Sequence, residues 1–270
     1  MRPPGLLYWA KRHSDRLWKG VPVMNKLVLP ALLLALALPV VAITGEEIIE
    51  KVDATFSTPN MWSVAQQTIV TPEGETRNFT IESYAKDGSR LQLSRYIKPE
   101  SVAGTTFLVL DYGDDIWTYF ADTGRTRQIA ANARQRSVMG SNMTYEDMSL
   151  SGNYADNYSA ELLGSADYSG VDCYKVELIP SYSYSSYSKL VAWVDKSTWV
   201  PLRIDYYDET GEELKRMLMR DIRMIDDIPT PYYTEVRGLQ DNSVTKMTML
   251  NVRYDLVLEE SLFSTSSLGR

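Results

Sequence analysis

Aspartates are the side chains of this chain whose spacing suggests chemistry. Asp111, Asp114 and Asp115 form one cluster, and Asp226 and Asp227 form a second. A pair of carboxylates can cleave a glycosidic bond, and a group of carboxylates can hold Ca²⁺. Both clusters fall in predicted turns, where aspartate is favoured because its side chain bonds to the local backbone. We therefore interpret them as turn residues and predict no catalytic residue and no metal site.

The chain has one histidine, His13, and one cysteine, Cys173. His13 lies upstream of a predicted signal peptide, so the mature protein lacks a triad, a histidine metal site and an imidazole base. Cys173 has no disulfide partner and is interpreted as a small strand or core residue. No glycine-rich loop ending in lysine follows a strand, so no nucleotide cofactor is expected. The sequence predicts a protein that is not an enzyme and needs no cofactor.

The N-terminal region reads as a targeting segment. Lys26 precedes the apolar run Leu27–Ala42, which ends in small residues, and this pattern is typical of a secretory signal peptide. We predict a signal peptide over 24–42, cleavage after Ala42 and a periplasmic location. An uncleaved anchor is the alternative, although sixteen residues with two prolines are short for a membrane span. Residues 1–23 are an upstream extension, either untranslated, with Met24 as the start, or a basic tail.

The charge balance argues against one class of partner. Residues 1–42 hold six of the 28 lysines and arginines and one of the 35 acids, so the rest has 22 basic against 34 acidic residues, a formal charge of −12. Nucleic-acid binding needs a basic surface, so it is not expected. The only dense basic run begins at Arg125 and Arg127. It is either a solvated surface or a contact for lipid headgroups or a membrane partner.

The elements that position these residues are mostly strands. In Gly104–Leu150 two β-rich runs flank the turn at Asp111–Asp115, and a third run makes a meander. Apolar and polar residues alternate with period two before and after it, which indicates strands with one buried face. Thr44 and the helical spacing over Glu46–Phe56 predict a helix. We expect a mainly β (α+β) fold: one antiparallel sheet of about eleven strands with a few short helices.

Three stretches of this region resemble one family. Residues 114–120 read D-D-I-W-T-Y-F, residues 124–129 read G-R-T-R-Q-I, and residues 139–147 read M-G-S-N-M-T-Y-E-D. The chain resembles the outer membrane lipoprotein-sorting family, the LolA-like periplasmic carriers, from about Gly45 to the C-terminus. The resemblance implies that 43–270 is a single half-open β-barrel domain, with helices over the concave face and acyl chains held inside.

The same resemblance implies partners: the acyl chains of a lipid or lipoprotein, and an inner-membrane exporter of the resistance-nodulation-division type. A monomer is expected. Two alternatives stay open, namely an envelope sensor on the same fold, as in sigma-factor regulators, and a secreted hydrolase. The sequence does not name the cargo.

Alternation within the strands predicts which side chains line the cavity. The apolar members of the N-terminal strands are assigned to one concave face, with methionines of the 137–148 segment as a lid. The predicted lining residues are Phe79, Ile81, Leu91, Leu93, Phe107, Val109, Trp117, Tyr119, Met139 and Met143. Arg95, Arg125 and Arg127 are candidates for contact with a headgroup or partner.

Two further expectations follow from the pattern. Glu82 and Leu93 are assigned to opposite faces, so Leu93→Glu should abolish lipid retention and Glu82→Lys should be silent. The serine- and tyrosine-rich segment Ser181–Ser188 is interpreted as a flexible hairpin loop, or as a stacking platform for a ligand.

Overall fold

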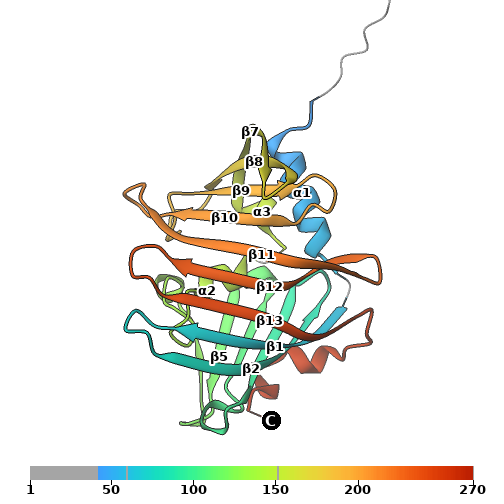
Figure 1. The fold of residues 1–270 in the computed structure, drawn as a ribbon. Coiled ribbons are helices and arrows are strands. Elements are labelled where there is room, and N and C mark those ends of the chain that lie inside the picture. The colour runs from blue at the N-terminus through green and yellow to red at the C-terminus, as the bar shows by residue number, and fades with distance from the viewer. Residues whose placement is uncertain (1–41, 59, 151, 270) are drawn as a thin grey trace, which may run out of the picture. The chain divides into compact units, whose positions relative to one another are not determined.

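The computed structural model describes residues 42–58, 60–150 and 152–269 (Figure 1). The predicted upstream extension and all of the predicted signal peptide except Ala42 lie outside the described residues. No helix within the described part of the chain is long and apolar enough to cross a membrane.

One antiparallel sheet contains all the named strands of the described residues. It has thirteen strands in the order β6-β5-β4-β3-β2-β1-β13-β12-β11-β10-β9-β8-β7. The bounds are β1 Asn60–Val70, β2 Thr76–Lys86, β3 Leu91–Lys98, β4 Thr106–Leu110, β5 Asp115–Phe120, β6 Arg125–Gln128, β7 Tyr158–Tyr168, β8 Val171–Pro180, β9 Lys189–Asp195, β10 Pro201–Tyr207, β11 Glu213–Ile225, β12 Ile228–Gly238 and β13 Val244–Tyr254. The sheet is curved and unclosed, which confirms the predicted half-open barrel.

The strand count exceeds the expected eleven by two. β6 has only four residues, and all of them are exposed, so no buried alternation marks it. β6 and β7 are the two outer strands in the sheet order. The pairing of β1 with β13 joins the two halves of the meander.

The longest connection between two consecutive strands of the sheet is the one from β6 to β7. It contains the turn of 3₁₀-helix η3 (Ala131–Ala133) and the short helices α2 (Tyr145–Ser149) and α3 (Tyr154–Asn157). Because β6 and β7 lie at opposite ends of the strand order, this segment must pass across the sheet. We call residues 129–157 the crossing segment.

Helix α1 (Gly45–Phe56) confirms the predicted N-terminal helix. Thr44 and Glu47 form a reciprocal capping box, so two backbone donors at the helix start are satisfied. Its buried face packs against the side chains of β7–β11. Gly45 lies so close to β7 that a Cβ there would come within 2.5 Å of the Ala160 carbonyl oxygen, and glycine therefore permits this approach.

Both faces of the sheet bury apolar side chains. On the inner face, one cluster joins α1 to β7–β12 and another joins β1–β5 to the crossing segment. On the outer face of β3–β5, the C-terminal segment covers a third cluster with Phe263 of η4 (Glu260–Phe263) and with Leu268, which follows η5 (Thr265–Ser267).

Candidate ligand-binding site

The inner face of β2 and β4 holds four of the predicted cavity residues. Phe79, Ile81, Phe107 and Val109 lie in one buried cluster with Tyr96. Their side chains meet because directly paired residues of antiparallel strands share a face. The Phe79 and Tyr96 rings pack edge to face at 5.4 Å, and Tyr96 and Phe107 do so at 5.8 Å. These residues form an apolar floor beneath the crossing segment.

Four other predicted cavity residues lie on the opposite, outer face, and their assignment to the cavity is wrong. Leu93 is paired with Leu108, and Leu108 with Trp117, so all three share a face. The remaining two, Leu91 and Tyr119, lie in the same outer cluster. Alternation shows that one face of β3 is apolar, but not which side of the sheet that face joins. The C-terminal segment, which supplies a second apolar layer, decides this.

The predicted assignment of Leu93 and Glu82 to opposite faces of the sheet is also wrong. Glu82 is paired with Arg95, two residues from Leu93, so Glu82 and Leu93 share the outer face. Glu82 Oε1 accepts a hydrogen bond of 2.9 Å from Trp62 Nε1. The alternation within β2 is regular, with Phe79, Ile81 and Ala85 buried, so the error lies in assigning the apolar face of β3 to the inner side of the sheet.

The crossing segment supplies methionines above the apolar floor. Met139 and Met148 pack on the floor, and Met143 packs on the neighbouring inner cluster around α1. A pocket of about 150 Å³ lies between floor and segment. It is lined by Gln67, Ile81, Ser83, Ser94, Tyr96, Phe107, Val138, Ser141, Met143, Met148 and Met247.

A second apolar pocket lies on the other side of Met143. Its volume is about 160 Å³, and its lining comes from α1, the crossing segment and β10–β12. The lining residues are Phe56, Met143, Asp147, Gly152, Tyr154, Pro201, Met217, Met219 and Thr234. Met143 therefore lines both pockets, and methionine has a flexible side chain.

A buried ion pair holds α2 to the sheet. Lys215 of β11 pairs with Asp147, and their side chains are only 6% and 2% exposed. Lys215 Nζ also donates to the Asn142 carbonyl at 3.0 Å and lies over the rings of Tyr187 and Tyr206. The Tyr187 hydroxyl donates to Asp147 Oδ1 at 2.8 Å. Burial and the nearby Asp147 carboxylate raise the pKa of Tyr187 well above its ordinary value.

Glu146 ties the crossing segment to the serine- and tyrosine-rich segment. Its buried carboxylate accepts from the hydroxyls of Tyr182 at 2.8 Å and Ser185 at 2.7 Å. The Ser186 backbone N–H and hydroxyl donate to its other oxygen. The predicted flexible hairpin loop is therefore an anchored segment. Both anchoring residues, Glu146 and Asp147, can be noticed in the sequence as adjacent acids after a capping threonine. Their partners are remote in the chain, so the sequence does not identify them.

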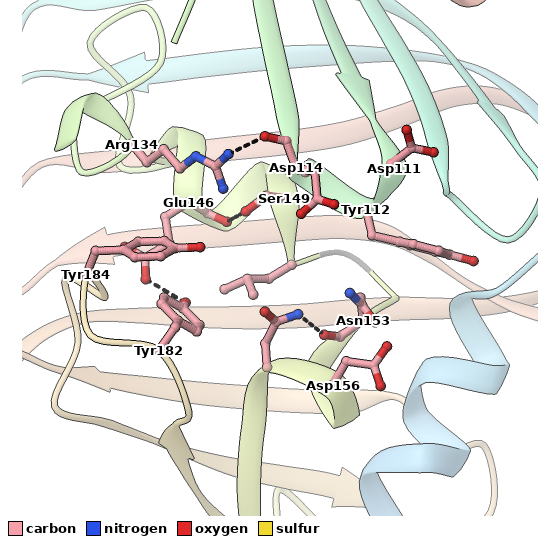
Figure 2. A pocket seen from close by; sticks show the side chains of 13 residues that line it. Asp111, Tyr112, Asp114, Arg134, Glu146, Ser149, Asn153, Asp156, Tyr182 and Tyr184 are labelled. Atoms are coloured by element: carbon pink, nitrogen blue, oxygen red, sulfur yellow. Dashed lines mark hydrogen bonds between the residues drawn. The ribbon is translucent and has the colours of Figure 1, made fainter. Parts of the chain in front are cut away.

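A polar pocket of about 240 Å³ lies beside these contacts (Figure 2). Both Tyr182 and Tyr184, candidates for a stacking platform, contribute to its lining. Asp111, which also borders it, pairs with Arg90 at 2.7 Å. Arg134 Nη2 donates to the Asp114 backbone carbonyl at 2.7 Å. The pocket is thus polar, and some of its charged side chains already form ion pairs or hydrogen bonds within the protein.

The aspartates lie in turns as predicted, except Asp115, which is the first residue of strand β5 and is paired with Leu110. Asp111 and Tyr112 have positive φ in the turn between β4 and β5, and Asp226 and Asp227 form the two-residue connection between β11 and β12. Within the described residues, no three histidine, cysteine, aspartate or glutamate side chains are grouped to hold a metal.

The predicted headgroup arginines lie apart from the apolar pockets. Arg125 and Arg127 are exposed on the outer strand β6. Arg95 shares its face with Leu93, as the alternation predicts, but that is the outer face. None of the three lines either apolar pocket.

Comparisons with known proteins agree on family and fold. A family model described as "Uncharacterized protein" matches residues 88–270. None of the curated proteins matches the chain. Among solved structures, an outer membrane lipoprotein-sorting protein domain from Vibrio parahaemolyticus has a TM-score of 0.78 at 24% identity, over 84% of this chain and 98% of that one.

Two further structures are similar over most of their length. A DUF1329 family protein from Desulfovibrio piger has a TM-score of 0.77 at 29% identity, over 83% of this chain and 97% of that one. A LolA superfamily protein from Nitrosomonas europaea has a TM-score of 0.70 at 20% identity, over 84% of this chain and 100% of that one. The chain belongs to the family whose model spans more than half of it, and its fold is that of the LolA-like outer membrane lipoprotein-sorting proteins.

Proposed function

We propose that the protein is a periplasmic carrier that binds a lipidated or otherwise hydrophobic cargo between the inner face of the sheet and the crossing segment, for transfer toward the outer membrane. The observation that carries this proposal is the pair of apolar pockets that are both lined by Met143. The family resemblance supports the same function, because its relatives include a domain described as lipoprotein-sorting.

The size of the pockets favours a closed, cargo-free state. Ligand pockets typically measure about 300–1,000 Å³, and each apolar pocket here is about half of the lower figure, at about 150 and 160 Å³. Movement of Met143 would join them into one channel. Burial of acyl methylenes is worth about 0.8 kcal/mol each, so even part of an acyl chain would be held. Ordering the chain reduces the net value.

The location and the membrane partner belong to this proposal. Periplasmic delivery rests on the signal-peptide pattern over 24–42. An inner-membrane exporter of the resistance-nodulation-division type is the partner that the family resemblance implies.

Lipid recovery from the purified protein tests the carrier function. Acyl species extracted from protein purified from the periplasm should be identified by mass spectrometry for the wild type, Met143→Glu and Met224→Glu. Met143 is half-buried and lines both pockets. Met143→Glu should therefore reduce the recovered lipid at least about tenfold, because burying a carboxylate against an acyl chain is costly. Met224 is 59% exposed on β11, so the same change there should leave recovery unaltered. Equal recovery from both variants would contradict the proposed site.

A further inference from the structure

The outer face of β10–β13 is basic in an acidic protein. In these four strands, orange to red in Figure 1, the apolar residues of the inner cluster alternate with charged residues that point away from it. The outward cations are Arg203, Arg216, Arg220, Arg237, Lys246 and Arg253, and the outward acids are Asp205, Glu213 and Glu235. Six cations thus face three acids, whereas residues 43–270 have 22 against 34. We call these outward residues the basic face.

Two of the three acids lie beneath the cations. The Asp205 side chain is 1% exposed and accepts from Arg203 Nε at 2.9 Å and from Arg216 Nε at 2.6 Å. Glu235 is 4% exposed and accepts from Arg237 and from the Tyr233 hydroxyl. The arginines remain 22%, 27% and 52% exposed, in the order Arg203, Arg216, Arg237. The outermost layer of the basic face is therefore guanidinium, held in place from below.

The arrangement of the cations has a cost to the fold. Arg216 and Arg237 stand directly opposite each other in the β11–β12 register, where like charges are unfavourable, although Arg216 also stands opposite Asp205 and Lys246 opposite Glu235. The other three cations, Arg220, Lys246 and Arg253, make no ion pair with any described residue. Repulsion of this kind is relieved when an anionic partner covers the face.

The chemistry of the basic face fits phosphate. Guanidinium forks bind phosphate oxygens with paired hydrogen bonds, and rows of cations are attracted to anionic membrane surfaces. The core of a protein–protein interface is typically enriched in apolar and aromatic side chains. Leu218, the apolar residue in the middle of the face, is buried, and the large exposed apolar side chains of these strands are Leu250 in the β13 bulge and Met224 beside the β11–β12 turn. We propose that the basic face docks the protein on a membrane surface rich in anionic phospholipid.

Vesicle sedimentation tests this docking without reference to cargo. The full protein should sediment with vesicles that contain phosphatidylglycerol and remain in solution with vesicles of phosphatidylcholine alone. Raising NaCl from about 0.05 M to about 0.5 M should release it, because salt screens exposed charges. The triple variant Arg220→Glu/Lys246→Glu/Arg253→Glu should bind at least about tenfold more weakly. The cavity variant Met143→Glu should bind as the wild type does, so failure of the carrier proposal would leave this result unchanged.

A control with the same charge change separates the basic face from net charge. The triple variant Lys51→Glu/Arg77→Glu/Lys98→Glu replaces three exposed cations on α1, β2 and β3 and should retain binding. Equal loss in both triple variants would overturn the inference, and so would loss in this control variant alone. Absence of binding by the wild type would also overturn it, and is the result expected of a face that binds an acidic protein. If the glutamate variant does not fold, as judged by circular dichroism, the glutamines Arg220→Gln/Lys246→Gln/Arg253→Gln replace it. Unaltered binding by this glutamine variant would equally overturn the inference.

Discussion

Three buried carboxylates each form hydrogen bonds or ion pairs with two or more groups that lie close to them in space. Glu146 has four donors, Asp147 has a lysine and a tyrosine, and Asp205 has two arginines. This is the pattern expected where desolvation would otherwise make a carboxylate costly. Each of these carboxylates therefore has a structural role in fixing one element to another.

Cys173 provides a test at the scale of one residue. It is buried among Val200 and Leu202, and burial raises the pKa of its thiol to about 11. The thiol form is therefore retained below pH 11, and at pH 8 only about 0.1% of the group is thiolate. Iodoacetamide at pH 8 should alkylate the native protein at least about a hundredfold more slowly than the urea-unfolded protein. Comparable rates in the two states would refute the buried placement.

At the scale of elements, the crossing segment is held to the sheet by side chains rather than by strand pairing. Asn142 bonds to Ser243 and Thr245, Asp147 bonds to Lys215, and Glu146 bonds to the 181–188 segment. Val138 and Tyr145 of the segment are also buried in the apolar floor cluster, so both polar and apolar contacts anchor the segment.

Lys215→Met tests the strongest of these contacts. It leaves the Asp147 carboxylate buried without its cation, and loss of one partner from a buried pair costs about 3–5 kcal/mol of unfolding free energy. The double variant Asp147→Asn/Lys215→Met should lose less, because asparagine needs no counter-charge and its amide oxygen can still accept the Thr144 N–H bond of the α2 capping box. Urea denaturation followed by circular dichroism measures both. A single variant within about 0.5 kcal/mol of the wild type would show that the pair does not stabilise the fold.

At the scale of the whole molecule, the sheet has two buried faces with different covers. The inner face of β2 and β4 is covered by a segment rich in methionine, and the outer face of β3–β5 is covered by the C-terminal segment. Only the first cover leaves apolar pockets that extend under it. The outer cover should therefore serve stability alone.

Phe263→Ala tests this division of roles. Phe263 is buried against Leu93 and Leu108, and truncation of a buried phenylalanine costs about 3–5 kcal/mol. The variant should unfold at lower urea concentration, yet the lipid recovered per folded molecule should equal that of the wild type. The exposed neighbour Glu260, changed to alanine, should affect neither quantity. A specific loss of lipid in Phe263→Ala would instead place cargo on the outer face.

The sequence by itself determined the elements and their class. Period-two alternation, the capping threonine before α1 and the aspartate turns follow from local geometry, and each was confirmed. Part of the apolar floor, Phe79, Ile81, Phe107 and Val109, was also predictable, because its residues alternate within single strands.

Only the tertiary structure decided which apolar stripe faces the pockets. Leu91 and Leu93 alternate as regularly as Phe79 and Ile81, but the pairing register and the C-terminal cover place them outside. The Lys215–Asp147 pair likewise joins a strand and a helix whose residues are 68 positions apart, and the basic face depends on the register of the four consecutive strands β10–β13. Local periodicity fixes the two faces of a strand, whereas the side on which each face lies depends on contacts that only the assembled sheet makes.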